Sequence, residues 1–183
     1  CGGILLTHSA GGDDIHLLVL TPGVGGAEGA HRIAAAKRAA QVLGVHLIAP
    51  DWSAADLPDL DYMVIRVKDS VHELAPDLVF APSGNDVRES RQHAFKATMI
   101  AGSKVPGLYC YQAATSTLEF RPTIFEDVSE YLDQKVGALS LYEGVSRGRP
   151  HLDPDLARAS ARYWGRFLGY GEVEPLEVVR HSL

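Results

Sequence analysis

The sequence predicts an α/β fold, a Rossmann-like, doubly wound and mainly parallel sheet with helices on both faces. Short apolar runs alternate along the chain with longer segments whose apolar residues recur at helical spacing. Prolines and glycines close most of these runs, which is typical of strands that end in loops. Because a crossover between parallel strands usually carries a helix, this alternation indicates a wound sheet. The 183 residues can enclose one sizeable core, so we expect one domain over 1–183.

The opening part of the chain predicts helix, strand, helix and strand. The segment "CGGILLTHSAGG" is typical of a short helix that glycines close. The apolar run 15–21 ends at a proline and predicts a buried strand. Apolar residues at helical spacing predict a helix over 30–43, which Gly44 ends. The next apolar run, 45–49, predicts a second strand.

The middle of the chain begins with a loop. Residues 50–61 are rich in proline and aspartate, which favours a loop. The mixed pattern over 62–76 favours a helix from Lys68 to Leu74. A buried strand, a helix and another strand are then predicted over 77–83, 88–101 and 107–112.

The last part of the chain predicts an extended segment and two helices. The segment "FRPTIFEDVS" is extended, and Pro122 favours the edge of a sheet. Ser129 can cap a helix that runs to Tyr142. Asp153 and Pro154 are a strong helix start, and we expect this last helix to reach Leu168.

Composition excludes several classes of function. A net charge of -6 and a pI near 5.7 argue against binding nucleic acid or an anionic membrane surface, since both need a concentrated positive field. No apolar run approaches the roughly 20 residues that span a bilayer. Only two cysteines occur, which is compatible with a reducing compartment, so we expect a cytoplasmic protein. The sequence leaves open a homo-oligomer or a partner subunit.

In wound sheets, ligands bind in the loops that follow the carboxyl ends of the strands. Asp51 and Asp86 each follow a predicted strand at that end, and Asp86 is the stronger candidate for a functional carboxylate. A capping role for Asp86 at the start of the 88–101 helix fits equally well. The loops expected to line a site are 21–30, 50–61, 82–91 and 112–122.

Several segments resemble, in the same order, the parts of one known family. "CGGILLTHSAGGDDIHLLVLTPGVGG" is similar to its Cys-Gly-Gly helix, strand and glycine-rich loop, and "APDLVFAPSGND" to the strand that enters its active site. "ARYWGRFLGYGEVEPLEVVR" resembles its terminal helix and places Glu174 at the position of the family's usual Glu. The family is the LmbE-like (PIG-L) superfamily of zinc-dependent N-deacetylases, and the resemblance covers almost the whole chain.

The resemblance fails at the first metal motif. Members of this superfamily carry His-Pro-Asp-Asp-Glu just before Cys-Gly-Gly, and the motif supplies two zinc ligands and the general base. Here that segment, together with the first central strand of the sheet, would fall upstream of Cys1. We therefore expect that the sequence is incomplete or that another segment fills the gap.

The second metal motif also differs. After the aspartate matched by Asp86, the family usually has His-x-Asp-His, whose first His assists the tetrahedral intermediate and whose last His binds zinc. Here the four positions read Arg88, Glu89, Ser90 and Arg91. A guanidinium stays protonated and has no acceptor, so it cannot ligate zinc. Its fixed charge near a dication should cost several kcal/mol even at an effective dielectric of about 20.

These differences predict a degenerate member, a pseudoenzyme that binds a sugar- or acyl-type ligand or a partner without zinc-dependent hydrolysis and without a cofactor. The ligand class we expect is a small anionic or sugar-like molecule. Asp86 and Arg88 take the catalytic positions, and Arg91, Asp51 and Glu174 are the predicted ligand-binding residues. Arg91 either holds an anion or is an exposed helix-start residue.

Two other functions remain open from the sequence. The first is an active zinc-dependent N-deacetylase, an amidase on an N-acetylglucosamine-type conjugate, whose first motif lies upstream and whose third ligand has moved, for example to His93. In that case zinc is the cofactor. The second is a metal-independent enzyme that reuses the same pocket, with Asp86, Arg88 and Arg91 as its polar groups.

Overall fold

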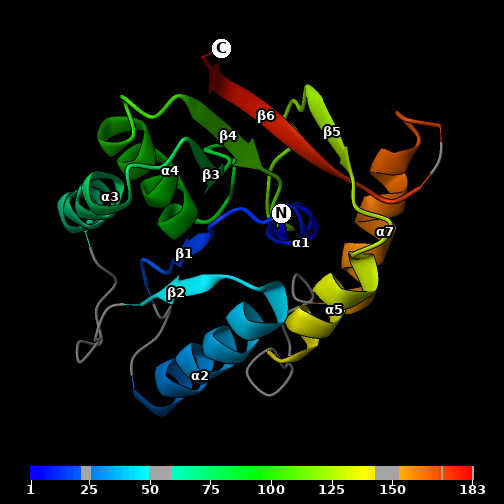
Figure 1. The fold of residues 1–183 in the computed structure, drawn as a ribbon, viewed down its shortest axis with the longest axis horizontal. Helices are drawn as coiled ribbons and strands as arrows, with labels where there is room; N and C mark the ends of the chain where they lie inside the picture. Colours follow the sequence, from blue (N-terminus) through cyan, green and yellow to red (C-terminus); the bar gives the residue numbers. More distant parts are fainter. Residues whose placement is uncertain (22–25, 50–58, 143–152, 170, 183) are drawn as a thin grey trace. The chain divides into compact units, whose positions relative to one another are not determined.

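The computed structural model describes residues 1–21, 26–49, 59–142, 153–169 and 171–182 (Figure 1). It has the predicted α/β class of fold. The chain divides into two compact units. Unit 1 comprises Cys1–Asp56 and Phe125–Glu174, and unit 2 comprises Leu57–Ile124 and Pro175–Leu183. One domain over the whole chain stays a prediction. Among the described residues, no helix is long and apolar enough to cross a membrane.

Unit 1 carries the predicted opening elements. Its strands β1 and β2 pair in parallel, with His16 opposite His46. Both strands are shorter than the apolar runs that predicted them. The helices and strands that lie entirely in this unit are α1 (Gly2–Ala10), β1 (His16–Leu18), α2 (Gly26–Leu43), β2 (His46–Ile48), α5 (Leu132–Ser140) and α7 (Pro154–Gly165).

The core of unit 1 forms where helices present small and branched apolar residues at helical spacing. Leu6 of α1, Ala39 and Leu43 of α2, and Ala138 of α5 form one buried cluster. Ala39 and Leu43 are four residues apart and therefore lie on the same face of α2. A second buried cluster joins α5 and α7 and consists of Leu132, Val136 and Ala161.

The two predicted helix starts of unit 1 have different outcomes. Asp153 is the N-cap of α7, where its side chain accepts a hydrogen bond from Asp155 N, as predicted. The prediction that Ser129 caps the preceding helix is wrong, because α5 begins at Leu132 after Tyr131. The Ser129 hydroxyl instead donates to Asp127 Oδ1 at 2.6 Å and accepts from Glu172 N at 2.9 Å.

Unit 2 contains the segment between the two parts of unit 1. Its helices and strands are α3 (Leu60–Leu74), β3 (Leu78–Pro82), α4 (Glu89–Ala101) and β4 (Gly107–Tyr111). Helix α3 packs on α4, and α4 packs on β3 (Figure 1). Two further strands, β5 (Ile124–Asp127) and β6 (Val173–His181), each run from one unit into the other.

The strands β3, β4, β6 and β5 form one sheet in that order. β3 and β4 are parallel, as predicted, but β6 is antiparallel to β4. The sheet is therefore mixed, with a parallel pair β3–β4 and an antiparallel pair β4–β6, and not parallel throughout. β5 lies at its edge, which confirms the edge position predicted from Pro122.

Two elements of this part correct the sequence-based predictions. Helix α3 starts at Leu60 and not at Lys68, because Asp59 accepts a hydrogen bond from Tyr62 N at 2.8 Å and so caps an earlier turn. The strand β6 was not predicted at all. The likeness of this stretch to a terminal helix holds only as far as Gly165, where α7 ends, and Glu174 lies in a strand.

Replacing either of two helical glycines of unit 1 by alanine should change the free energy of unfolding, in opposite directions. Gly3 is buried in α1, and a Cβ there would lie 2.6 Å from the Val128 Cβ. Gly137 is exposed within α5, and a Cβ there would meet nothing within 4 Å. We expect Gly3→Ala to destabilise the fold by about 2 kcal/mol through overpacking. Gly137→Ala should stabilise it by about 0.5–1 kcal/mol, because alanine is the better helix former. Urea unfolding measures both, and equal effects would contradict this packing.

Candidate functional site

The loop that follows β3 in unit 2 carries Asp86, the main candidate from the sequence. Its side chain is fully buried and is surrounded by donors. Arg88 N donates to Asp86 Oδ1 at 2.8 Å, and the Thr115 hydroxyl lies 2.8 and 3.0 Å from the two oxygens. Arg91 Nη1 donates to Asp86 Oδ2 at 3.3 Å and also to Thr115 Oγ1. Both carboxylate oxygens therefore already have partners from within the protein.

The Asp86 network joins two of the four loops that were expected to line a site. Asp86 forms an isolated antiparallel bridge with Ser116. Backbone hydrogen bonds run from Val87 N to Thr115 O at 3.2 Å and from Thr117 N to Asn85 O at 2.8 Å. The loops 82–91 and 112–122 therefore meet in unit 2, as parallel strands that end at the same edge require.

Asp86 does not cap helix α4 itself. The N-cap of α4 is Arg88, which makes no side-chain capping hydrogen bond. The bond from Arg88 N to Asp86 Oδ1 instead closes a tight turn just before the helix. Asp86 thus fixes the loop and its neighbour rather than the helix terminus.

Arg91 is directed inward, onto Asp86. Its side chain is 29% exposed, so it is not simply an exposed helix-start residue. Its charge also reaches Tyr111 at the end of β4. Burial raises the pKa of Tyr111, the Arg91 guanidinium opposes that rise, and the charge of Asp86 adds to it. Arg88, in contrast, lies on the surface.

The other two predicted residues are not brought into this cluster by the described structure. Asp51 lies outside the described residues. Glu174 belongs to unit 1 and is 4% exposed. Its carboxylate accepts from Gly3 N at 3.2 Å and Ile4 N at 2.9 Å, and it pairs with Lys135 Nζ at 2.7 Å. In unit 1 this carboxylate therefore anchors the first turn of α1, where backbone N–H groups have no helical partner. A ligand-binding role for Glu174 stays a prediction.

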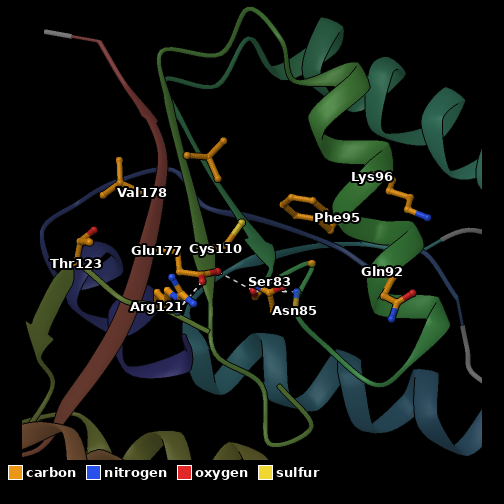
Figure 2. A pocket seen from close by; sticks show the side chains of 12 residues that line it. Ser83, Asn85, Gln92, Phe95, Lys96, Cys110, Arg121, Thr123, Glu177 and Val178 are labelled. Atoms are coloured by element: carbon orange, nitrogen blue, oxygen red, sulfur yellow. Dashed lines mark hydrogen bonds between the residues drawn. The ribbon is translucent and has the colours of Figure 1, made fainter. Parts of the chain in front are cut away.

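A pocket of about 450 Å³ opens in unit 2 beside this loop (Figure 2). It lies within the range of about 300–1,000 Å³ that is usual for small-molecule sites. The apolar part of its lining comes from Phe95 of α4, Val178 and Val179 of β6, and Cys110 of β4. Its polar side chains are Ser83, Asn85, Gln92, Lys96, Arg121, Thr123 and Glu177.

Glu177 is the centre of a hydrogen-bond network in this pocket, which we call the β6 pocket (Figure 2). The Ser83 hydroxyl donates to Glu177 Oε2 at 2.6 Å, and Arg121 N donates to Oε1 at 2.7 Å. Asn85 N donates to the Ser83 hydroxyl at 3.2 Å. Burial, with a smaller contribution from the Glu177 charge, raises the pKa of Cys110 to about 12. This thiol is therefore a packed group and not a nucleophile.

The sequence did not indicate Glu177, because the strand that carries it was not recognised. In β6, Glu177 stands opposite Cys110 of β4, and Cys110 stands beside Ala81 of β3. Ser83 follows on the same face of β3 two residues later, which brings it near Glu177. The loop after β3 was predicted to line a site, and Ser83, Gly84 and Asn85 confirm that part.

Comparison with solved structures identifies the fold. A protein described as the conserved protein TT1542 from Thermus thermophilus matches over 100% of this chain and 89% of its own, with 26% identity and a TM-score of 0.77. The 4-carboxy-2-hydroxymuconate hydratase GalB from Pseudomonas putida KT2440 matches over 100% and 91%, with 19% identity and a TM-score of 0.77. The A40926 pseudoaglycone deacetylase Dbv21 matches over 100% and 92%, with 17% identity and a TM-score of 0.76.

This chain therefore shares the fold of these solved proteins, one of which is the deacetylase Dbv21. No protein-family model matches the sequence, and a search of curated proteins gives no significant match. The likeness therefore lies in the fold, that is, in the three-dimensional arrangement of the helices and strands.

The resemblance to the LmbE/PIG-L superfamily implies a zinc ion. The described residues around Asp86 do not form a zinc site. Zinc needs several deprotonated Cys, His or carboxylate donors around one point. The oxygens of Asp86 accept from Arg91, Thr115 and Arg88 N instead. Over the part of the chain that the structure describes, no three His, Cys, Asp or Glu side chains come together to hold a metal ion.

His93, the proposed replacement ligand, also has another partner. Its Nε2 lies 3.7 Å from Glu89 Oε1, one turn earlier in α4. A His and a Glu at this spacing on one helix face form an ordinary surface pair. The relocation of a zinc ligand to His93 stays a prediction without support from this geometry.

Proposed function

We propose that this protein is a member of the LmbE/PIG-L superfamily that binds a small sugar-type ligand in the β6 pocket and does not catalyse zinc-dependent hydrolysis. One observation carries the second half of the proposal: the guanidinium of Arg91 pairs with the buried carboxylate of Asp86. A cation on the carboxylate that would face the metal replaces the metal's charge without supplying a Lewis acid or an activated water.

The lining of the β6 pocket supports a sugar-type ligand more than an acyl chain. Asn85 and Gln92 line it with amide side chains, which both donate and accept hydrogen bonds. Glu177 adds a fixed acceptor. Phe95 adds an aromatic ring that can cover the apolar face of a sugar. A saturated chain would leave these polar groups without partners.

Titration with N-acetylglucosamine tests the binding half of the proposal. We expect saturable binding with a dissociation constant of about 1 mM or tighter, given the usual affinity per ligand atom. Saturation-transfer NMR detects binding in this range. Gln92→Ala should weaken binding about two- to tenfold, which is the effect of one lost hydrogen bond.

Gln134→Ala is the matched control for Gln92→Ala. Both glutamines donate through Nε2 to a backbone carbonyl, Gln92 to Asp86 O and Gln134 to Val42 O. Only Gln92 lines the pocket. Equal binding by both variants and the wild type, or no binding at all, would reject the proposed site.

A second candidate function is an active N-deacetylase. The observation in its favour is the likeness of the fold to the deacetylase Dbv21. The likeness to the hydratase GalB shows that this fold also serves another reaction class, so the fold alone does not select the deacetylase. Release of acetate from an N-acetylglucosamine conjugate by the purified chain, at a rate that chelators abolish, would establish this second function.

A further inference from the structure

Helix α7 of unit 1 carries a stripe of exposed apolar side chains on its outer face (orange in Figure 1). Its inner face packs on α5 through the buried Ala161. The opposite face exposes Leu156, Ala159 and Tyr163 at helical spacing. Phe167 extends the stripe into the turn after the helix, and Phe167 and Tyr163 are each 52% exposed. A contiguous apolar patch of this kind usually marks a surface that another molecule covers.

The guanidinium of Arg166 lies over both of these aromatic rings. Its Cζ is 4.1 Å from the centre of the Tyr163 ring and 4.8 Å from the centre of the Phe167 ring. Its Nη2 donates to the Tyr163 hydroxyl at 2.8 Å. Arg162, one turn earlier, pairs with Glu172 at 3.5 Å, but no carboxylate among the described residues pairs with Arg166. The Arg166 charge is therefore held in place by the rings and available to a carboxylate of another molecule.

A charge of opposite sign lies at the other end of α7. Asp155 is exposed in the first turn of the helix. Over the described part of the chain, its carboxylate forms no ion pair. Asp155 and Arg166 are separated by three helical turns, so they lie only about 20° apart around the helix axis, on one flank of the stripe. Leu156 and Phe167 have the same separation and lie on the other flank.

This pattern makes the outer face of α7 complementary to itself in the antiparallel direction. Suppose that two α7 helices pack about a two-fold axis at the level of residue 161. Ala159 then faces Tyr163 of the second copy, a small side chain against a large one. Asp155 faces Arg166 of the second copy, and Leu156 faces Phe167. The axis repeats each contact, so ion pairs form along one flank and apolar contacts along the other.

We infer that the outer face of α7 is the interface through which two copies of this chain form an antiparallel, two-fold symmetric dimer. The inference uses residues of unit 1 alone and does not rest on the proposed function. Arg162 lies close to the axis, and its pairing with Glu172 offsets the repulsion between the two copies of Arg162. A single helix face is smaller than the roughly 800 Å² per partner of a standard interface, so we expect a dissociation constant of about 10–100 µM.

Analytical ultracentrifugation of the purified chain over about 1–500 µM measures this dimerisation. Tyr163→Ala should weaken it about tenfold or more, because an aromatic side chain at the centre of an interface contributes much of the binding free energy. Leu118→Ala is the control, since Leu118 is a fully exposed leucine of unit 2. It should leave the dissociation constant unchanged.

Charge reversal tests the antiparallel arrangement. Asp155→Arg and Arg166→Asp should each weaken the dimer about tenfold or more, because like charges then meet at both ends of the interface. A mixture of the two variants should form a heterodimer within about threefold of the wild-type affinity, because opposite charges meet again. Asp69→Arg and Lys104→Asp make the same changes of charge at exposed residues of unit 2, and neither should alter dimerisation.

The possible results separate this interface from any other. A chain that stays monomeric up to about 500 µM overturns the inference. A dimer that Tyr163→Ala and both charge reversals leave unchanged also overturns it, because that dimer uses another surface. Circular dichroism shows whether the variants are folded. If both folded variants lose their own dimers and their mixture does not dimerise, the antiparallel interface is wrong.

Discussion

Replacing Asp86 with alanine should destabilise unit 2 by about 3 kcal/mol, at the lower end of the range for breaking a buried ion pair. The substitution leaves the guanidinium of Arg91, the hydroxyl of Thr115 and the backbone N–H of Arg88 without their acceptor. The lower end applies because Arg91 is 29% exposed and water can solvate part of its charge. Urea unfolding followed by circular dichroism measures the change.

The control for Asp86 is another aspartate that pairs with an arginine. Asp133 Oδ1 lies 2.6 Å from Arg158 Nη1, but the Asp133 side chain is 88% exposed. Asp133→Ala should therefore cost less than about 1 kcal/mol, as exposed pairs usually do. If the two alanine variants proved equally stable, Asp86 would not be the acceptor that joins the loops.

The stability of unit 1 should fall in acid because of Glu174. Burial raises the pKa of this carboxyl, whereas the Lys135 ammonium and the Ile4 N–H lower it, and the net pKa lies below the usual 4.5. A carboxyl whose pKa is depressed by folding stabilises the fold above its unfolded pKa and loses that contribution as pH falls through the folded value. We therefore expect the stabilising contribution of Glu174 to be lost as the pH falls below about 4.5.

Urea unfolding at several pH values between 7 and 2 tests this dependence with Glu174→Gln, which cannot ionise. The variant should be less stable than the wild type by about 1 kcal/mol or more at pH 7, and the difference should shrink as the pH falls below about 4.5. Glu172→Gln is the control, since Glu172 pairs at 3.5 Å with an arginine that is 69% exposed. A difference between Glu174→Gln and wild type that did not change with pH would show that the depressed pKa is wrong.

Helices and strands could be predicted from the sequence where the apolar residues recur at regular spacing and a glycine or proline marks the end. The helix ending at Gly44 and the strand ending at Pro82 are examples, because local backbone chemistry fixes where each ends. α3 was placed too late, since its cap at Asp59 stands in an aspartate-rich segment that reads equally well as a loop. β6 was missed because its segment contains Pro175 and because Val173 to Leu176 are all buried, so no alternation reveals a strand.

The candidate site was only partly predictable, because part of it lies on β6, the strand that the sequence did not reveal. The contact between the loops at Asp86 and Thr115 follows from the order of parallel strands, which the sequence indicates. The β6 pocket needs Glu177 opposite Cys110, a pairing between residues far apart along the chain. Strand register of this kind depends on packing across the sheet and cannot be read from either segment alone.

Arg91 stands where the resembled zinc enzyme family has its metal-binding histidine, and the same residue forms the internal ion pair with Asp86. A histidine at position 91 could donate a neutral nitrogen to a metal, whereas arginine brings a permanent charge and donors only. In the described structure, the Arg91 guanidinium donates hydrogen bonds to Asp86 and Thr115. Arg91 itself therefore offers no nitrogen that could ligate a metal ion.

The amount of zinc that the purified chain retains tests whether Arg91 has taken the place of a metal ion at Asp86. The purified chain is incubated with excess zinc, freed of unbound metal by gel filtration, and measured by inductively coupled plasma mass spectrometry. Because Arg91 pairs with Asp86, we expect far less than one zinc ion per chain. Close to one tightly held zinc per chain, lost in an Asp86→Ala variant, would contradict it.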